Sequence, residues 1–280
     1  MGKANGTYGS SVQGQLDGTF VDNELHGLIS PHLGPLLLTM NRSHTAGHML
    51  NYGLYNYVFN RGIEVTSDVY GFQVGQDDRT GVLVQINNVG DGRTSIRNEI
   101  MVGWHVYPEL YGDSKTHFFV LWTRDGYQST GYLPEANIPT VPGVAINAVS
   151  DPEGVKRTIV FKVLKDSAED WLVHIGFDSE PYLIGRFPKS IFTSMGRGDN
   201  VRIDGFVVTS TTQLAPMGSG FLSNIVKAAS FSNIQLIDQK RQRLNLIKNG
   251  NNSTYSSDEK IYSVSPINVE GKFTYGGPLQ

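Results

Sequence analysis

Short runs of β-branched and aromatic residues, separated by turn-forming residues, recur along most of the chain. Each run is five to nine residues long and is bounded by Gly, Pro, Asn, Asp or Ser, as strands usually are. This regular spacing predicts an all-β protein: an antiparallel β-sandwich of two large curved sheets with a concave groove, without alternating helices. The predicted strands cover residues 80–86, 101–107, 117–123, 144–149, 158–164, 171–175, 201–209 and 231–237.

The first part of the chain has a different pattern. Residues 19–22 are strand-like, 33–40 are apolar and 52–59 are rich in aromatic side chains. Because about 60 residues bury little core by themselves, we expect this part to pack on the main domain, either as edge strands or as a segment lying over the groove. The predicted organisation is an N-terminal segment, 1–60, and one sandwich domain, 61–280.

Composition narrows the classes of function. The chain has 280 residues, 39% of them hydrophobic, with a formal charge of −3 and 18% charged residues, which is typical of a globular protein. Such a nearly neutral chain has no long-range attraction for nucleic acid or anionic lipid, so we expect neither as a partner. The absence of cysteine excludes disulfides, thiol nucleophiles and thiolate zinc sites.

We expect no cofactor and no metal. His44 and His48 have the i, i+4 spacing of helical metal ligands, but Gly47 between them disfavours a helix. The sequence contains neither a Walker-type nor a dinucleotide-type glycine loop. It also lacks an apolar run long enough for a membrane span, and its first residues lack the apolar core of a signal peptide.

A series of motifs resembles the neprosin family, plant proteins whose founding members are glutamic prolyl endopeptidases. The resemblance covers roughly residues 68–278 and implies a secreted protein. The motifs occur in family order: Gly-Trp-His-Val-Tyr-Pro-Glu-Leu-Tyr-Gly-Asp (103–113), Phe-Phe-Val-Leu-Trp-Thr (118–123), Asp-Gly-Tyr-Gln-Ser-Thr-Gly (125–131), Leu-Ile-Gly-Arg-Phe-Pro (183–188), Met-Gly-Ser-Gly (217–220) and Tyr-Gly-Gly-Pro (275–278).

The chain departs from this family at both catalytic acids. The family has a glutamate three residues before the tryptophan of the Gly-Trp motif, where this chain has Met101. The second family glutamate ends a Trp-Gly-Gly-Glu motif, and Phe206 aligns with it here. The resemblance therefore implies that the family's peptidase mechanism is lost. We refer to Met101 and Phe206 as the family acid positions.

Side chains alternate along a strand, so residues two apart share a face. If the family acid positions face the groove, each has another acid two residues earlier on the same face, Glu99 and Asp204. A displacement of two residues along a strand is roughly 6.6 Å. The same alternation predicts these groove-lining residues: Met101, Gly103, His105 and Tyr107 on one strand, and Arg202, Phe206 and Val208 on the other.

Three functions remain open from the sequence. The first is a protein that binds a peptide or small molecule in the groove without cleaving it, because the substitutions make the groove more apolar. The second is an enzyme with different acid and base chemistry on a small molecule. The third is a glutamic peptidase whose acids have shifted by two residues. The candidate catalytic residues are Glu99, His105, Tyr107 and Asp204.

Overall fold

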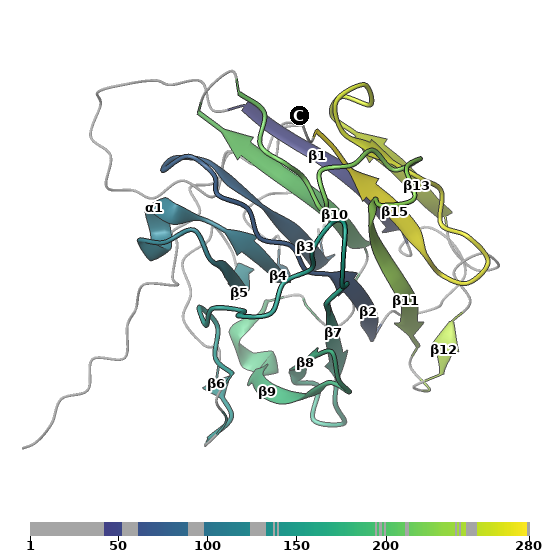
Figure 1. Ribbon diagram of the computed structural model, residues 1–280. Coiled ribbons are helices and arrows are strands. Elements are labelled where there is room, and N and C mark those ends of the chain that lie inside the picture. The colour runs from purple at the N-terminus through teal and green to yellow at the C-terminus, as the bar shows by residue number, and fades with distance from the viewer. Residues whose placement is uncertain are drawn as a thin grey trace, which may run out of the picture.

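The computed structural model describes residues 42–51, 61–88, 98–123 and 133–278, except positions 137, 139, 194, 196–197, 199, 211–212, 239, 241 and 245–250. Two antiparallel sheets face each other across one core, as expected for a β-sandwich (Figure 1). Within the described residues, helix is limited to the short α1 (Pro108–Tyr111) and the 3₁₀ turn η4 (Lys189–Ile191).

The smaller sheet has six strands in the order β13-β1-β10-β3-β4-β5. Strand β1 lies between β10 and β13, so this part of the N-terminal region forms an inner strand of the sheet. The division of the chain at residue 60 stays a prediction. The bounds are β1 (Arg42–Asn51), β3 (Arg79–Asn88), β4 (Asn98–Val106), β5 (Thr116–Thr123), β10 (Asn200–Thr209) and β13 (Asn251–Ser256).

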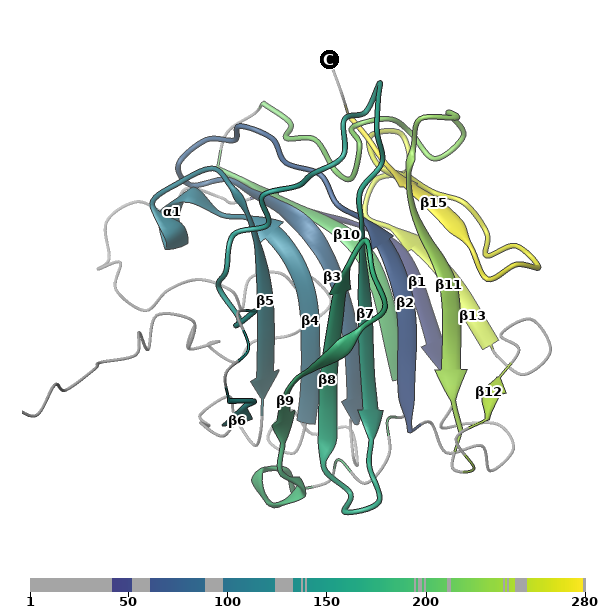
Figure 2. The same cartoon turned by 60° about the horizontal axis from the view of Figure 1, so that its bottom comes forward.

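The larger sheet has nine strands, with the path β14-β15-β11-β2-β7-β8-β9-β6 and β12 paired to β11 (Figure 2). The bounds are β2 (Gly62–Asp68), β6 (Leu133–Pro134), β7 (Thr158–Lys165), β8 (Trp171–Phe177), β9 (Tyr182–Phe187), β11 (Ala229–Ile237), β12 (Arg243–Leu244), β14 (Ser263–Val264) and β15 (Phe273–Gly276).

The predicted all-β sandwich is confirmed, and all but one of the predicted strands are present. The exception is 144–149, which lies beside β5 only from Val144 to Ile146, where Phe118 N–H donates to the Val144 carbonyl at 3.1 Å and Ile146 N–H donates to the Thr116 carbonyl at 2.7 Å, around an isolated bridge between His117 and Ala145. Pro142 and Gly143 turn the chain toward β5 just before this segment, and the segment then leaves the sheet. The runs 19–22, 33–40 and 52–59 lie outside the described residues.

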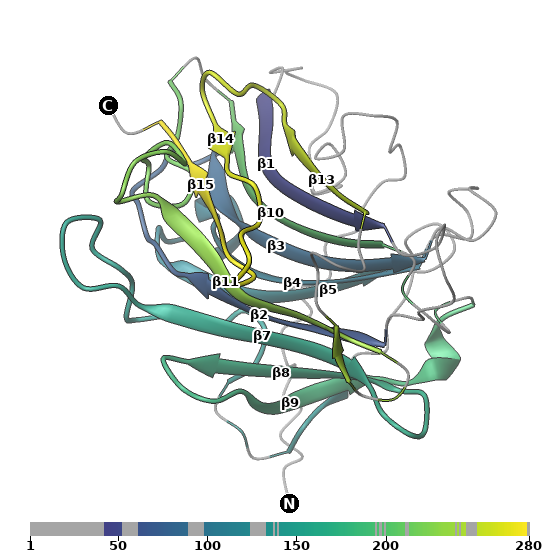
Figure 3. The same ribbon diagram turned by 90° about the vertical axis from the view of Figure 1, so that its right-hand side faces the viewer.

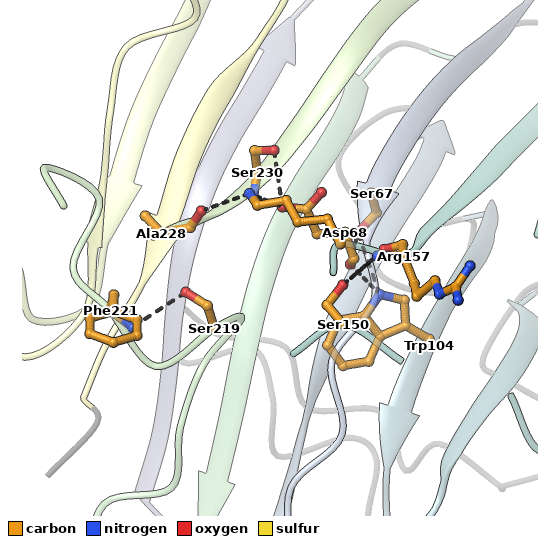
Figure 4. Close-up of polar contacts among 10 residues, drawn as sticks. Ser67, Asp68, Trp104, Ser150, Arg157, Ser219, Phe221, Ala228 and Ser230 are labelled. Carbon is orange, nitrogen blue, oxygen red and sulfur yellow. Dashed lines mark hydrogen bonds and ion pairs between the residues drawn. The ribbon is translucent and has the colours of Figure 1, made fainter. Parts of the chain in front are cut away.

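The main core lies between the two sheets (Figure 3). Strand β4 contributes Ile100, Val102 and Trp104 to it, and the intervening residues point to the opposite side of the smaller sheet. A polar junction at the end of β2 fixes the tryptophan, because Trp104 Nε1 donates to the Asp68 carbonyl oxygen at 3.0 Å (Figure 4). The Asp68 carboxylate in turn accepts from the backbone N–H of Ser230 at 2.9 Å. The register of β4 is thereby tied to the larger sheet.

Candidate functional site

The outer face is the side of the smaller sheet that points away from the larger sheet. The structure places two sets of predicted site residues on it, at alternating positions of β4 and β10. Tyr107 directly follows β4, and its ring lies 5.9 Å from that of His105. The residues of these two strands on the outer face are Glu99, Met101, Gly103, His105, Arg202, Asp204, Phe206 and Val208.

One half of the outer face is apolar, and both family acid positions belong to it. Met101 is 6% exposed and Phe206 is 2% exposed, so both side chains are buried. Leu83 on β3 lies diagonally between them in the strand register. A thioether and a phenyl ring in such a packed cluster cannot activate water. The apolar half consists of Leu83, Met101, Phe119, Phe206 and Val208, with Leu121 packed against it.

Two glycines make room for the large side chains of this face. Gly103 lies opposite Phe119, and a Cβ at Gly103 would lie 2.7 Å from the end of the Phe119 ring. Gly47 on β1 lies opposite Asp204, and a Cβ there would collide with Asp204. Strand glycines of this kind mark places where another group approaches the backbone closely.

The other half of the outer face is polar and is centred on an ion pair. The Arg202 side chain donates to Asp204 Oδ2 from Nε at 3.1 Å and from a terminal nitrogen at 2.6 Å. Arg202 Nε also lies 2.6 Å from the Tyr255 hydroxyl, which reaches across Gly47 from β13. Burial raises the Tyr255 pKa well above its usual range, so the hydroxyl keeps its proton. The polar half consists of Gln85, Asn87, Glu99, Asn200, Arg202, Asp204 and Tyr255.

Glu99 and Asp204 lie far apart, and their separation equals that of Met101 and Phe206. Glu99 lies in register with Asn200, which is four positions from Asp204 on β10, with β3 between the two strands. That offset corresponds to about 13 Å along the strands and about 10 Å across them, hence about 16 Å between Cα atoms. Met101 and Phe206 are related by the same offset, because β4 and β10 run parallel to each other. Moving both acids by two residues therefore translates the pair without changing its separation.

His105 lies at the far end of the apolar half, where it is held by aromatic neighbours. Its Nε2 is 2.9 Å from the Tyr111 hydroxyl, and its ring stacks on Phe119 at 4.5 Å. Burial lowers the His105 pKa to about 3, helped by the nearby Arg79 guanidinium. The imidazole is therefore neutral at physiological pH, and Nε2 is engaged by Tyr111.

Tyr111 links His105 to a second histidine. The Tyr111 ring stacks on His117 at 3.7 Å, almost parallel. His117 Nδ1 is 2.9 Å from the Gly143 carbonyl oxygen, and Nε2 is 2.9 Å from an Asp113 carboxylate oxygen. Both partners are acceptors, so each ring nitrogen that carries a proton can donate to one of them. The hydrogen bond from His117 is the main reason that the Asp113 pKa lies below its usual range.

Tyr107 is likewise engaged. Its hydroxyl donates to Glu109 at 3.1 Å, and the Arg79 guanidinium lies 5.0 Å from its ring centroid. Burial raises the Tyr107 pKa.

Sequence reasoning identified His105 and Tyr107 but missed Arg79, Tyr111 and Tyr255. The Pro-Glu-Leu-Tyr-Gly-Asp turn motif hinted at Tyr111, whereas no local pattern indicates that Tyr255 reaches Arg202.

The histidines considered as metal ligands lie on strand β1 and point toward the core, so the helical spacing does not apply. Among the described residues there is no group of three or more His, Cys, Asp or Glu side chains arranged to hold a metal ion. The helices in the described part of the chain are also too short to span a membrane.

Comparison with known proteins assigns the family. A sequence model named Neprosin matches residues 77–278, which is most of the chain. The chain belongs to the neprosin family. The match extends from the residues before β3 to the end of the described chain. It includes β4, β10 and every residue of the apolar and polar halves, whereas β1 lies outside it.

Solved structures with a similar arrangement include peptidases. Scytalido-glutamic peptidase with a transition state analog inhibitor is 12% identical and has a TM-score of 0.48, over 85% of this chain and 100% of that chain. SCP-B, a member of the eqolisin family of peptidases in complex with the tripeptide Ala-Ile-His, is 11% identical with a TM-score of 0.48 over the same shares of the chains.

Proposed function

We propose that this neprosin-family protein has lost glutamic-peptidase activity and binds a peptide or small molecule on the outer face of the smaller sheet. The observation that carries the proposal is the packing of both family acid positions, Met101 and Phe206, into one apolar cluster. A glutamic peptidase requires carboxyl groups that activate water and stabilise the tetrahedral intermediate. Two buried apolar side chains supply neither role.

The nearby acids do not replace the lost ones in this proposal. Asp204 is fully buried and bound to the Arg202 guanidinium at 2.6 Å, which favours its charged form and occupies one of its oxygens. Glu99 is also buried, at 1% exposure, about 16 Å away by the strand register. An aspartate fixed in an ion pair is poorly suited to donate a proton to a leaving group.

The apolar half supplies the recognition surface in this proposal. Sites for small molecules and peptides combine apolar contact area with a few fixed polar groups. Leu83, Phe119 and Val208 are 7%, 3% and 4% exposed, so they supply apolar contacts only to a ligand for which this cluster opens, and the Arg202–Asp204 pair and Tyr255 supply fixed donors and acceptors beside it. Cleavage is not required for such a surface to select a ligand.

The strand register disfavours a second candidate, a peptidase with shifted acids, because Glu99 and Asp204 lie about 16 Å apart and cannot both reach one water molecule. Glu99 and Asp204 keep the separation of the two family acid positions, because the strands that carry them run in the same direction. A peptidase of this kind would have to move its substrate path by roughly 6.6 Å. It would also need Asp204 to leave Arg202 during the reaction.

A third candidate, different acid and base chemistry at His105 or Tyr107, is less favoured by the geometry. His105 Nε2 is engaged by Tyr111, and the Tyr107 hydroxyl donates to Glu109. A base with a pKa of about 3 accepts protons weakly at neutral pH.

Digestion of proline-containing peptides from pH 3 to pH 8 separates these functions. The proposal predicts no cleavage above background and saturable binding of peptides selected from a random library. Efficient cleavage would overturn it. Cleavage that disappears in Glu99→Gln would identify the shifted pair.

A matched pair of variants tests the role of the apolar half. Leu83→Asn places a polar group at the centre of the cluster and should abolish peptide binding, whereas Leu83→Met keeps its size and polarity and should preserve binding. Circular dichroism establishes that both variants are folded. Equal binding by both folded variants would contradict a ligand site on this half.

A further inference from the structure

Two histidines on β1 join the smaller sheet to the C-terminal segment, defined here as residues 257–275. His44 and His48 lie four residues apart on the core-facing side of the strand. The His48 ring packs on Phe273 at 4.5 Å, and the His44 ring packs on Tyr262 at 5.0 Å. Strands β14 and β15 of this segment pack against β1. We call the two side chains the β1 histidine pair.

Each imidazole has one nitrogen that receives no hydrogen bond from the described residues. His48 Nε2 donates to the Ser265 carbonyl oxygen at 2.8 Å, so Nδ1 carries the lone pair of the neutral ring. That Nδ1 is buried and has no hydrogen-bond partner among the described residues. His44 Nε2 is in the same situation within the described part of the chain, while its Nδ1 lies 3.4 Å from Ser257 Oγ.

A second proton on His48 Nδ1, or on His44 Nε2 when His44 Nδ1 donates to Ser257, would create a buried N–H without an acceptor among the described residues. Leaving a buried donor unsatisfied costs about 1–3 kcal/mol, and more for a charged group. The neighbouring groups stabilise the charged imidazoles too little to offset this cost. Asp258 favours the charged form of His44 and Arg42 opposes it, and the Ser265 carbonyl is the group that favours charged His48. Burial outweighs these contacts and lowers the pKa of both histidines.

We propose that the β1 histidine pair makes the junction between β1 and the C-terminal segment acid-sensitive, so that acidification opens this junction before the rest of the fold. Protonation of either imidazole requires its orphan nitrogen to reach water. That exposure separates His48 from Ser265 and Phe273, and His44 from Tyr262. The acid sensitivity of this junction is independent of any ligand on the outer face, because both imidazole rings lie on the opposite side of the sheet.

The direction of the pH dependence follows from the lowered pKa values. In the opened state each histidine has an ordinary pKa near 6.5, and in the closed state it is lower. The junction is therefore fully stable above about pH 6.5 and loses stability as pH falls toward the lowered values. Each histidine increases the opening constant by up to about tenfold per pH unit in that window.

Hydrogen exchange of the full chain between pH 7.5 and pH 5.0 tests this proposal. After correction for the intrinsic exchange rate, opening of 42–51 and 263–276 should increase as pH falls, approaching tenfold to hundredfold per unit. The segments 62–68 and 79–88 contain no histidine and serve as internal references. Their opening should change less steeply over the same range.

Two variants assign the effect to these residues. His44→Gln/His48→Gln keeps an amide donor for Ser265 and cannot take up a proton, so it should remove the extra pH dependence of 42–51. His174→Gln is the matched control, because burial also lowers the His174 pKa but this residue lies on β8 of the larger sheet. It should leave the 42–51 profile unchanged.

If the double variant does not fold, His44→Gln alone should halve the extra slope on a logarithmic scale. The comparison of exchange between segments of the wild-type protein needs no variant. A pH profile of 42–51 that matches those of 62–68 and 79–88 would overturn the proposal, as would an unchanged slope in a folded double variant.

Discussion

The apolar and polar halves of the outer face share β3, β4 and β10, yet they bury their side chains by opposite means. The apolar half excludes water by packing Leu83, Met101 and Phe206 together. The polar half buries Arg202 and Asp204 by pairing them under Tyr255. Hydrophobic packing tolerates exchange between side chains of similar size, whereas a buried ion pair depends on both partners. The two halves should therefore respond differently to substitution.

The largest effect should come from breaking the ion pair. Arg202→Met leaves the fully buried Asp204 carboxylate without its main partner and should reduce the free energy of unfolding by about 3–5 kcal/mol. Urea unfolding measures the change. The double variant Arg202→Met/Asp204→Leu should recover most of the loss, because it removes the uncompensated charge. A single variant within 1 kcal/mol of wild type would contradict the importance of the pair.

A cavity in the apolar half should have a somewhat smaller effect. Met101→Ala should cost about 3 kcal/mol, and the size-conserving Met101→Leu less than about 1.5 kcal/mol. The same unfolding measurement compares them. Similar losses for the two substitutions would show that the half is not packed as the structure describes.

His105, at the end of the apolar half, should make the free energy of unfolding depend on pH. The pKa of His105 falls to about 3 in the folded state, below its ordinary value near 6.5. The folded protein therefore loses up to about 1.4 kcal/mol per pH unit as pH falls below 6.5, or about 2 kcal/mol by pH 5. His105→Gln should lose correspondingly less over this range. An identical pH dependence in the two proteins would show that His105 is solvated.

Removing the hydroxyl beside His105 should have a moderate effect. Tyr111→Phe keeps the ring stacked on His117 but removes the partner of His105 Nε2, at an expected cost of about 1–2 kcal/mol. Thermal unfolding detects the change. Tyr182→Phe is the comparison variant: it removes the hydrogen bond between the Tyr182 hydroxyl and Thr140 at a position that is 39% exposed, where water can replace the lost partner and the cost should be smaller.

The smallest effect should come from Asp113→Asn. Its side chain is 37% exposed, so loss of the hydrogen bond with His117 should change the free energy of unfolding by less than about 1 kcal/mol. The lowered Asp113 pKa means that this contribution is present at neutral pH and is lost as pH falls below about 4. A larger loss at neutral pH would indicate that Asp113 holds the α1 turn in place.

Alternation along β4 and β10 could be predicted because it is a local property of strands. Glu99, Met101 and Gly103 share one face for the same reason that Trp104 points to the core. The segment 144–149 shows the limit of this approach. Its residues have strand propensity, but pairing depends on whether a neighbouring strand is available, and only an isolated bridge to His117 forms.

The state of the candidate acids was not accessible from the sequence. Asp204 looked like an acid two residues from a family acid position, and the structure shows it bound to Arg202 and buried beneath Tyr255. His44 and His48 have the spacing of helical metal ligands, which Gly47 between them already disfavoured, and the structure places them on a strand against the C-terminal segment. In each case the deciding partner is distant in sequence.

Local patterns in the chain were enough to predict the all-β class, the positions of most strands and the alternation of their faces. They could not predict which residues meet across strands, because register and sheet order depend on contacts between distant segments. Tyr255 reaches Arg202 across 53 positions, and Ser265 reaches His48 across 217. Propensity and alternation act over a few residues, whereas the chemistry of a buried charge depends on every group that folding brings beside it.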